Sequence, residues 1–170
     1  MCEGDLPPDL IWWFLILLRH GMNTAFDSVP PPGQPFVILE HPADLGIEAF
    51  GRTLAEAFQN AAVGLMSVIL DLDSIAENEE RMVTIDGVDH GQLLVKWLSE
   101  VLYLYDGQGF AGKKFLVRKM ENQNLEASVW GEPFSIVKHP ARLDVKAVTY
   151  HQLLIEQKPE GARVRVYLDI

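Results

Sequence analysis

The sequence predicts an α+β fold built on a largely antiparallel or mixed β-sheet structure. Two amphipathic helices, expected over about residues 53–70 and 90–105, stand among several short strand-like segments. The predicted order is two strands, a helix, a strand, a helix and then several strands. This order differs from the regular alternation of a doubly wound parallel sheet, which favours the α+β class. A chain of 170 residues is long enough for one domain with a substantial core.

Both helices are predicted to begin at a capping sequence. Thr53 is followed three residues later by Glu56, and Asp89 is followed at the same spacing by Gln92. Apolar residues then recur at helical spacing behind each cap. In the first helix they are Leu54, Ala57, Phe58, Ala61, Ala62, Leu65 and Ile69, and in the second they are Leu93, Leu94, Trp97, Leu98, Val101, Leu102 and Tyr105.

The strand predictions rest on short apolar or alternating runs separated by Gly, Pro and Asn. The expected strands are Phe36–Glu40, Ile47–Gly51, Met82–Val88, Phe115–Met120, Leu125–Trp130, Leu143–Thr149, Leu153–Gln157 and Arg163–Ile170. Gly131–Glu132–Pro133 is interpreted as a turn, because glycine and proline usually interrupt strands.

Residues 1–35 are interpreted as an amino-terminal extension and a proline-rich linker, followed by a domain over residues 36–170. The apolar run Leu10–Leu18 is much shorter than the roughly 20 residues that a spanning helix needs. Acidic residues precede the run, which argues against a signal peptide. We expect residues 1–21 to be an upstream extension, with translation starting at Met22. A membrane-associating tail is the alternative.

Composition excludes some classes of function. The formal charge is −10, and no cluster of Lys and Arg is present to hold a phosphate backbone. A protein partner with a basic face is more compatible with this charge. The single cysteine, Cys2, cannot form an internal disulfide, which indicates a reducing, cytoplasmic setting. The sequence has no P-loop, GxGxxG or GxSxG motif.

The carboxyl end is the first candidate site. The strand-like run Val164–Ile170 places the side chain of Asp169 next to the terminal carboxylate of Ile170. Two hard oxygen donors on an ordered strand suit Ca²⁺ or Mg²⁺ better than a softer metal. The alternative is that the chain simply ends at a domain edge.

Two further residues could join such a site. Asp44 lies in a proline-containing turn between two predicted strands, where a purely structural Asp is common. Lys146 lies in an apolar run and needs a carboxylate partner if it points inward, whereas a surface lysine is the alternative.

The histidines and one glutamate are weaker candidates. His41 and His139 each precede a proline, which is typical of turns as well as of metal sites. His151 lies in a strand-like segment, and Glu132 lies in the predicted turn. These four residues are expected to support metal ligands from outside the coordination sphere, and Glu132 could instead be a ligand itself or simply an exposed residue.

Several stretches, in their order along residues 36–170, resemble the archease family. They are His41–Gly46, Thr53–Phe58, Trp97–Tyr103, Gly131–Pro133, Lys138–Pro140, Val145–His151 and Leu168–Ile170. Each stretch alone is weak, but the ordered set is specific.

The resemblance implies a non-catalytic, metal-binding activator of an RtcB-type RNA ligase in tRNA splicing and RNA repair. In that family the ligase carries out GTP-dependent guanylylation and end joining, and archease promotes guanylylation and multiple turnover. The family pattern implies Asp44, Asp169 and Ile170 as ligands of a divalent cation, Ca²⁺ first and Mg²⁺ or Mn²⁺ as alternatives. It implies a functional role for Lys146. The ligase is then the partner, RNA is reached only through it, and no membrane is involved.

Two other classes of function stay open at this point. Two carboxylates, a lysine and several histidines would suit a metal-dependent phosphoesterase acting on RNA ends if they converge. A chaperone-like interaction module with a purely structural cation is the third interpretation.

Overall fold

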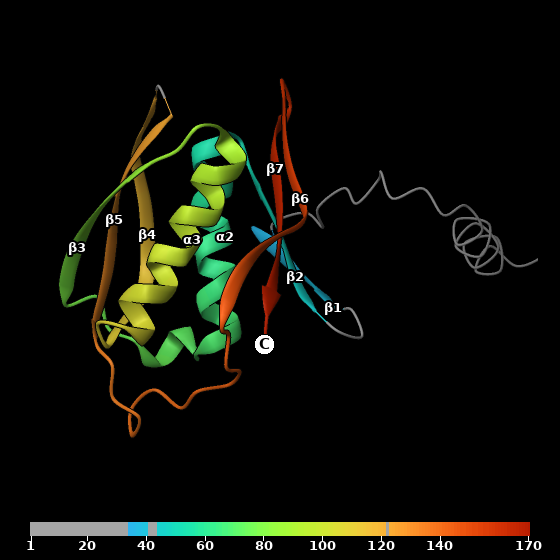
Figure 1. The fold of residues 1–170 in the computed structure, drawn as a ribbon. Coiled ribbons are helices and arrows are strands. Elements are labelled where there is room, and N and C mark those ends of the chain that lie inside the picture. Colours follow the sequence, from blue (N-terminus) through green and yellow to red (C-terminus); the bar gives the residue numbers. More distant parts are fainter. Residues whose placement is uncertain (1–33, 41–43, 122) are drawn as a thin grey trace, which may run out of the picture.

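The computed structural model describes residues 34–40, 44–121 and 123–170, which form two antiparallel sheets with two helices between them (Figure 1). The first sheet has the order β1–β2–β7–β6 and the second has the order β3–β5–β4. The strands are β1 (Phe36–Glu40), β2 (Leu45–Gly51), β3 (Glu79–Asp86), β4 (Phe110–Glu121), β5 (Asn124–Pro133), β6 (Ala147–Lys158) and β7 (Gly161–Asp169). The helices are α2 (Leu54–Ile69) and α3 (His90–Asp106), with a short 3₁₀ turn, η1, over Leu72–Ser74. The predicted α+β class is confirmed.

Both helices begin at the predicted caps. The Thr53 hydroxyl accepts a hydrogen bond from the Glu56 N–H at 3.2 Å, and the Asp89 carboxylate accepts one from the Gln92 N–H at 2.7 Å. The Glu56 carboxylate accepts from the N–H of Arg52, one residue before the cap, at 2.8 Å. These bonds satisfy amide groups of the first turn that have no partner inside the helix.

The core lies between the sheets, and both helices contribute to it. Trp97 of α3 is fully buried, and its indole N–H donates to the Phe58 carbonyl of α2 at 3.1 Å. Its ring meets that of Phe115 from β4 edge to face, with the centroids 6.2 Å apart. Trp97 therefore joins the two helices to the second sheet, and its one polar group has a partner.

Several strand boundaries differ from the prediction. β2 and β3 begin earlier than expected, at Leu45 and Glu79, and β4 begins at Phe110. The predicted turn at Gly131–Glu132–Pro133 is wrong, because these residues end β5 and pair with β4. A Cβ atom at position 131 would lie 1.9 Å from the Ala111 carbonyl oxygen. The glycine therefore permits a close approach of two strands instead of a turn.

The two predicted strands Leu143–Thr149 and Leu153–Gln157 correspond to one strand, β6, which contains a large bulge. Thr149 pairs with Tyr167 and Leu154 pairs with Arg165, so residues 150–153 stand opposite a single residue of β7. Gln152 within the bulge has a positive φ of 47°. The bulge contacts the start of α3, because a Cβ atom on Gly91 would meet the Leu153 side chain at 2.9 Å.

Most of the predicted amino-terminal extension, residues 1–33, lies outside the described residues. The predictions for Leu10–Leu18 and Met22 therefore stay predictions. Within the part of the chain that the structure describes, no helix is long and apolar enough to cross a membrane.

Replacing Gly131 by alanine is expected to lower the free energy of unfolding by roughly 2 to 4 kcal/mol, because backbone must move to admit the new methyl group. Gly109→Ala is the matched control. Gly109 has a φ of 61°, but a Cβ atom added there would meet nothing within 4 Å, so the cost should be about 1 kcal/mol. Urea unfolding followed by circular dichroism would measure both. Equal losses in the two variants would contradict the role of the close strand contact.

Candidate functional site

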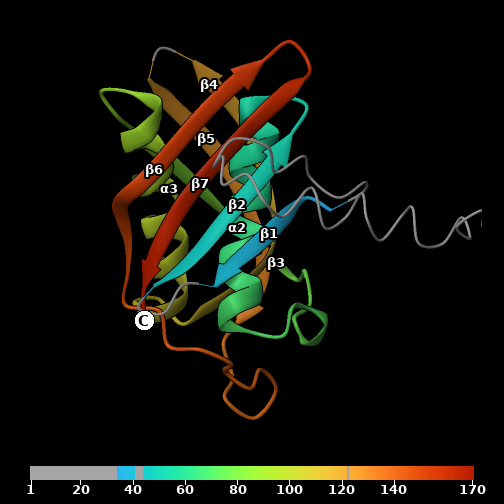
Figure 2. The same cartoon turned by 90° about the vertical axis from the view of Figure 1, so that its right-hand side faces the viewer.

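Three strands bring the predicted site residues to one end of the first sheet. Leu45 pairs with Leu168, so Asp44 precedes β2 at the end where Asp169 closes β7. On the other side of β7, Ala147 pairs with Asp169, and the Lys146 N–H donates to the Asp169 carbonyl at 2.8 Å. Figure 2 shows the carboxyl end beside the starts of β2 and β6. Asp44, Lys146, Asp169 and Ile170 therefore gather from distant parts of the sequence.

The backbone at this end is held, while the side chains are open to solvent. Asp169 and Lys146 are exposed, Asp44 is half-buried, and Ile170 is 41% exposed. Carboxylates that are accessible to solvent can bind a cation without a large desolvation cost.

The donor set at this end fits a hard divalent cation. Asp44 and Asp169 contribute carboxylate oxygens, which Ca²⁺ and Mg²⁺ prefer. Among the described residues, no group of three or more His, Cys, Asp or Glu side chains is placed to hold a metal ion. A cation bound here would therefore need another oxygen donor, such as the carboxylate of Ile170, water or a group of a partner.

The cross-strand pair Glu48–Arg165 lies in the middle of the β2–β7 ladder and supports this alignment. Glu48 is 1% exposed, and its carboxylate accepts from the Arg165 guanidinium at 2.6 Å and from Arg163 at 3.5 Å. Arg163 also pairs with Glu156 of β6 at 2.8 Å. These contacts connect three neighbouring strands through charges that are shielded from water, where removing one partner is costly.

The predicted supporting residues separate into three cases. His41 lies outside the described residues. His151 is exposed, and its ring meets that of Tyr167 edge to face with the centroids 5.7 Å apart. Because Tyr167 stands two residues before Asp169 on β7, His151 is on the strand pair that carries the candidate site. Glu132 and His139 belong to a different cluster.

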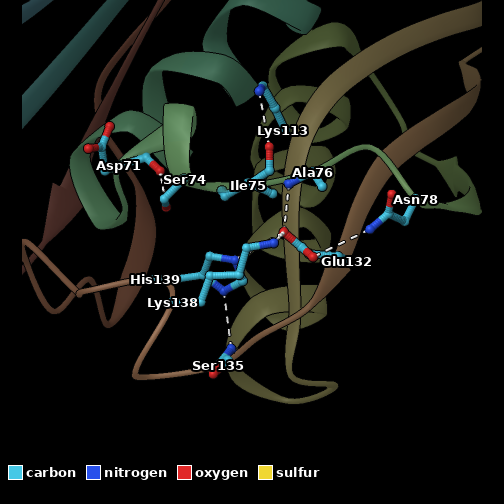
Figure 3. Close-up of polar contacts among 10 residues, drawn as sticks. All are labelled: Asp71, Ser74, Ile75, Ala76, Asn78, Lys113, Glu132, Ser135, Lys138 and His139. Atoms are coloured by element: carbon cyan, nitrogen blue, oxygen red, sulfur yellow. Dashed lines mark hydrogen bonds and ion pairs between the residues drawn. The ribbon is translucent and has the colours of Figure 1, made fainter.

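Glu132, at the end of β5 in the second sheet, is the centre of that cluster (Figure 3). One of its carboxylate oxygens accepts from the Ala76 N–H at 2.6 Å, from the Lys138 ammonium at 2.5 Å and contacts the His139 ring at 3.2 Å. The other oxygen lies 3.5 Å from the Asn78 side-chain amide. Glu132 and His139 thus contact each other, and none of these bonds leads to Asp44 or Asp169.

His139 is completely buried, and both of its ring nitrogens have partners. Nδ1 accepts from the Ser135 N–H at 3.1 Å, so in the neutral ring Nε2 carries the hydrogen that points to Glu132. The cluster fastens the segment after β5 to the chain around Ala76. We call these residues, Ala76, Glu132, Ser135, Lys138 and His139, the Glu132 clip.

The charge and hydrogen bonds of the clip act on the acidity of Glu132. The Lys138 hydrogen bond is the largest cause and the Ala76 N–H is the next, and together with His139 they lower the pKa of Glu132 to about 2. Partial burial of the carboxylate opposes this change.

The sequence analysis names Glu132 and His139 as candidate residues but not their partners Ala76, Ser135 and Lys138. Lys138 and His139 stand together before Pro140, but the sequence pattern assigns their partner Glu132 to a turn. The Ala76 contribution is a backbone N–H far away in sequence, for which the sequence carries no side-chain signal.

Residues 36–170 match the archease protein family. The chain belongs to the archease family. The archease of Sulfurisphaera tokodaii is 45% identical over 126 residues, which are 74% of this chain and 91% of that protein. The archease of Methanosarcina mazei is 36% identical over 84% of this chain and its own full length. The family resemblance predicted from the sequence is confirmed.

Solved structures agree with the archease assignment. The solution structure of Methanobacterium thermoautotrophicum protein 1598 superposes with a TM-score of 0.71 at 33% identity, covering 81% of this chain and 99% of that one. The crystal structure of a Thermotoga maritima archease, described as a possible chaperone, gives a TM-score of 0.50 at 18% identity over 85% of this chain and 99% of that one, which supports the fold alone.

The Glu132 clip is expected to make the free energy of unfolding depend on pH in the acid range. Since the folded-state pKa of Glu132 is about 2 and the ordinary value is 4.5, its contribution to stability is present above pH 4.5 and is lost as the pH falls from 4.5 towards 2. Glu132→Gln should therefore lower the free energy of unfolding at neutral pH and flatten its decline over this window. Glu160→Gln, in the exposed β6–β7 turn, is the control. Chemical denaturation at a series of pH values would measure this, and parallel curves for wild type and Glu132→Gln would refute it.

Proposed function

We propose that this archease is a non-catalytic activator of an RtcB-type RNA ligase in the cytoplasm, promoting the ligase's GTP-dependent guanylylation and multiple turnover in tRNA splicing and RNA repair. The observation that supports the proposal is the gathering of Asp44, Lys146 and Asp169 at one sheet end from three strands. These are the positions to which the family resemblance assigns the metal and the functional lysine.

The proposed site combines a fixed backbone with open charges. Asp44 and Asp169, together with the carboxylate of Ile170, would hold a divalent cation, Ca²⁺ first and Mg²⁺ or Mn²⁺ as alternatives. The cation would supply positive charge next to the phosphates and metal ions of a nucleotide pocket. Lys146 adds a second positive charge at this end of the sheet, where its backbone N–H donates to the Asp169 carbonyl.

The partner is proposed from exposure and charge as well as from the family. The site is open rather than enclosed, since Asp169, Lys146 and Ile170 are all exposed. An open site at the tip of a sheet can enter a cleft of another protein. The net charge of −10 disfavours direct binding of RNA, so RNA is engaged through the ligase.

The deciding experiment is RNA end joining by the organism's own RtcB-type ligase at substrate excess, with and without this protein. Wild type should raise the number of turnovers, and Asp44→Asn and Lys146→Ala should lower the stimulation by about tenfold or more, because each removes one charge from the site. Asp73→Asn in η1 and Lys158→Ala at the opposite end of β6 are exposed, matched controls that should stimulate like wild type.

The outcomes separate the alternatives. Stimulation that survives in Asp44→Asn and Lys146→Ala contradicts the proposed site. RNA turnover by this protein without the ligase would support the phosphoesterase. Loss of folding in Asp44→Asn, seen by circular dichroism, would support a structural cation in a chaperone-like module.

Calcium titration tests the ligand set directly. Asp169→Asn, and a short peptide added after Ile170, should each weaken Ca²⁺ affinity by about tenfold or more, because each reduces the anionic charge of the site. The same peptide at the amino end should leave the affinity unchanged. Isothermal titration calorimetry measures the three proteins, and wild-type affinity in the carboxyl-terminal version would exclude the Ile170 carboxylate as a ligand.

A further inference from the structure

The segment between β5 and β6, residues 134–146, forms a loop that projects beyond both sheets at the end where the carboxyl terminus lies (Figures 1 and 2). Two adjacent apolar residues of this loop, Ile136 and Val137, are 78% and 91% exposed. Isolated exposed apolar residues are common, but two neighbours at a projecting tip form an apolar feature outside the core of the described residues.

The backbone around Ile136 and Val137 is fixed by a tight turn. The Ser135 carbonyl accepts from the N–H groups of Lys138 at 3.1 Å and His139 at 2.7 Å, which closes the turn around the two apolar residues. The buried His139 ring and the Lys138 ammonium then anchor the turn to Glu132 through the clip described above (Figure 3).

The carboxyl side of the loop is fixed as well. The Arg142 N–H donates to the Ile69 carbonyl at the end of α2 at 2.8 Å, and Ala141 forms an isolated β-bridge with Leu70. The Arg142 guanidinium also pairs with Asp71 at 3.1 Å. The loop is therefore held by hydrogen bonds on both sides of its tip, so binding at the tip would remove little conformational entropy.

The turn itself gives no reason for these residue types. The central positions of a tight turn favour Pro, Asp, Asn, Ser or Gly, while β-branched residues are suited to strands. Ile136 and Val137 occupy the two central positions between Ser135 and Lys138. Their side chains lie outside the core formed by the described residues, so they are open to contact with a partner.

We propose that Ile136 and Val137 form an apolar anchor that inserts into an apolar pocket on the RNA ligase, next to the place where the metal end binds. The inference rests on the proposed function. The loop runs directly into Lys146, whose N–H bonds Asp169, so the anchor and the candidate metal site are presented at the same end of the molecule. A single partner bound at this end is therefore expected to contact both.

The surroundings of the anchor fit a protein interface. Lys138 directly follows the apolar pair and Arg142 follows further along the same loop, and their side chains are 49% and 54% exposed. An apolar centre with a charged rim is the usual arrangement of an interface in which few residues dominate the affinity. The ligase pocket should accordingly be apolar with polar or acidic groups around it.

The test measures ligase affinity of the double variant Ile136→Ser/Val137→Ser by biolayer interferometry. We expect the affinity for the ligase to fall by about tenfold or more. The affinity for calcium and the free energy of unfolding should stay as in wild type, because both side chains are outside the core. Val88→Ser, the same exchange at a 67% exposed position, should bind like wild type. The apolar exchange Ile136→Val/Val137→Ile should retain affinity.

The outcomes are distinct. Wild-type affinity in the serine double variant, with wild type shown to bind, would overturn the anchor and leave the proposed function standing. A wild-type dimer in analytical ultracentrifugation that the double variant dissociates would assign the tip to self-association and overturn the ligase pocket. Absence of both ligase binding and stimulation by wild type would overturn the proposed function, and the anchor with it.

Discussion

The alignment of β2 with β7 is the constraint on which the candidate site depends. Asp44 and Asp169 are 125 residues apart in sequence, and only the antiparallel ladder between these strands brings them to one edge. A slip of one residue would invert the faces of the whole strand. Such a slip would turn Glu48 towards the core in place of Ile47 and Ala49 and separate it from Arg165. The buried charge pair therefore penalises the wrong register, while Ile47 and Ala49 favour the right one.

A second constraint, the Glu132 clip, acts at the start of the loop that leads from β5 to Lys146. The Glu132 clip belongs to the second sheet, yet it fastens the start of the loop that delivers Lys146 to the first sheet. The two sheets are separated by helices, so this loop is a covalent and hydrogen-bonded route between them (Figure 1). Glu132 and His139 thus fix the start of the loop that leads to Lys146.

Local features were predictable from residue patterns, whereas long-range features were predictable only where the family resemblance indicated them. The helix starts at Thr53 and Asp89 follow from capping and spacing, both of which involve residues within one turn. The family resemblance brought Asp44, Lys146 and Asp169 together before any geometry was known. The turn assigned to Gly131 failed because its reason is a neighbouring strand, which single-sequence patterns do not contain. The partners of Glu132 were missed for the same reason, since Ala76 contributes only a backbone N–H.

The bulge in β6 lets two residues that should point to opposite faces of the strand pack on the same side. Val148 belongs to the core, and Ile155 packs against the core as well. In uninterrupted alternation an even-numbered and an odd-numbered residue point to opposite faces. In β6, four residues, 150–153, stand opposite one residue of β7. The in–out alternation of side chains is therefore shifted by an odd number of residues, and Val148 and Ile155 reach the same face. The bulge therefore lets both halves of β6 present apolar side chains to one core while pairing with a single continuous partner, β7.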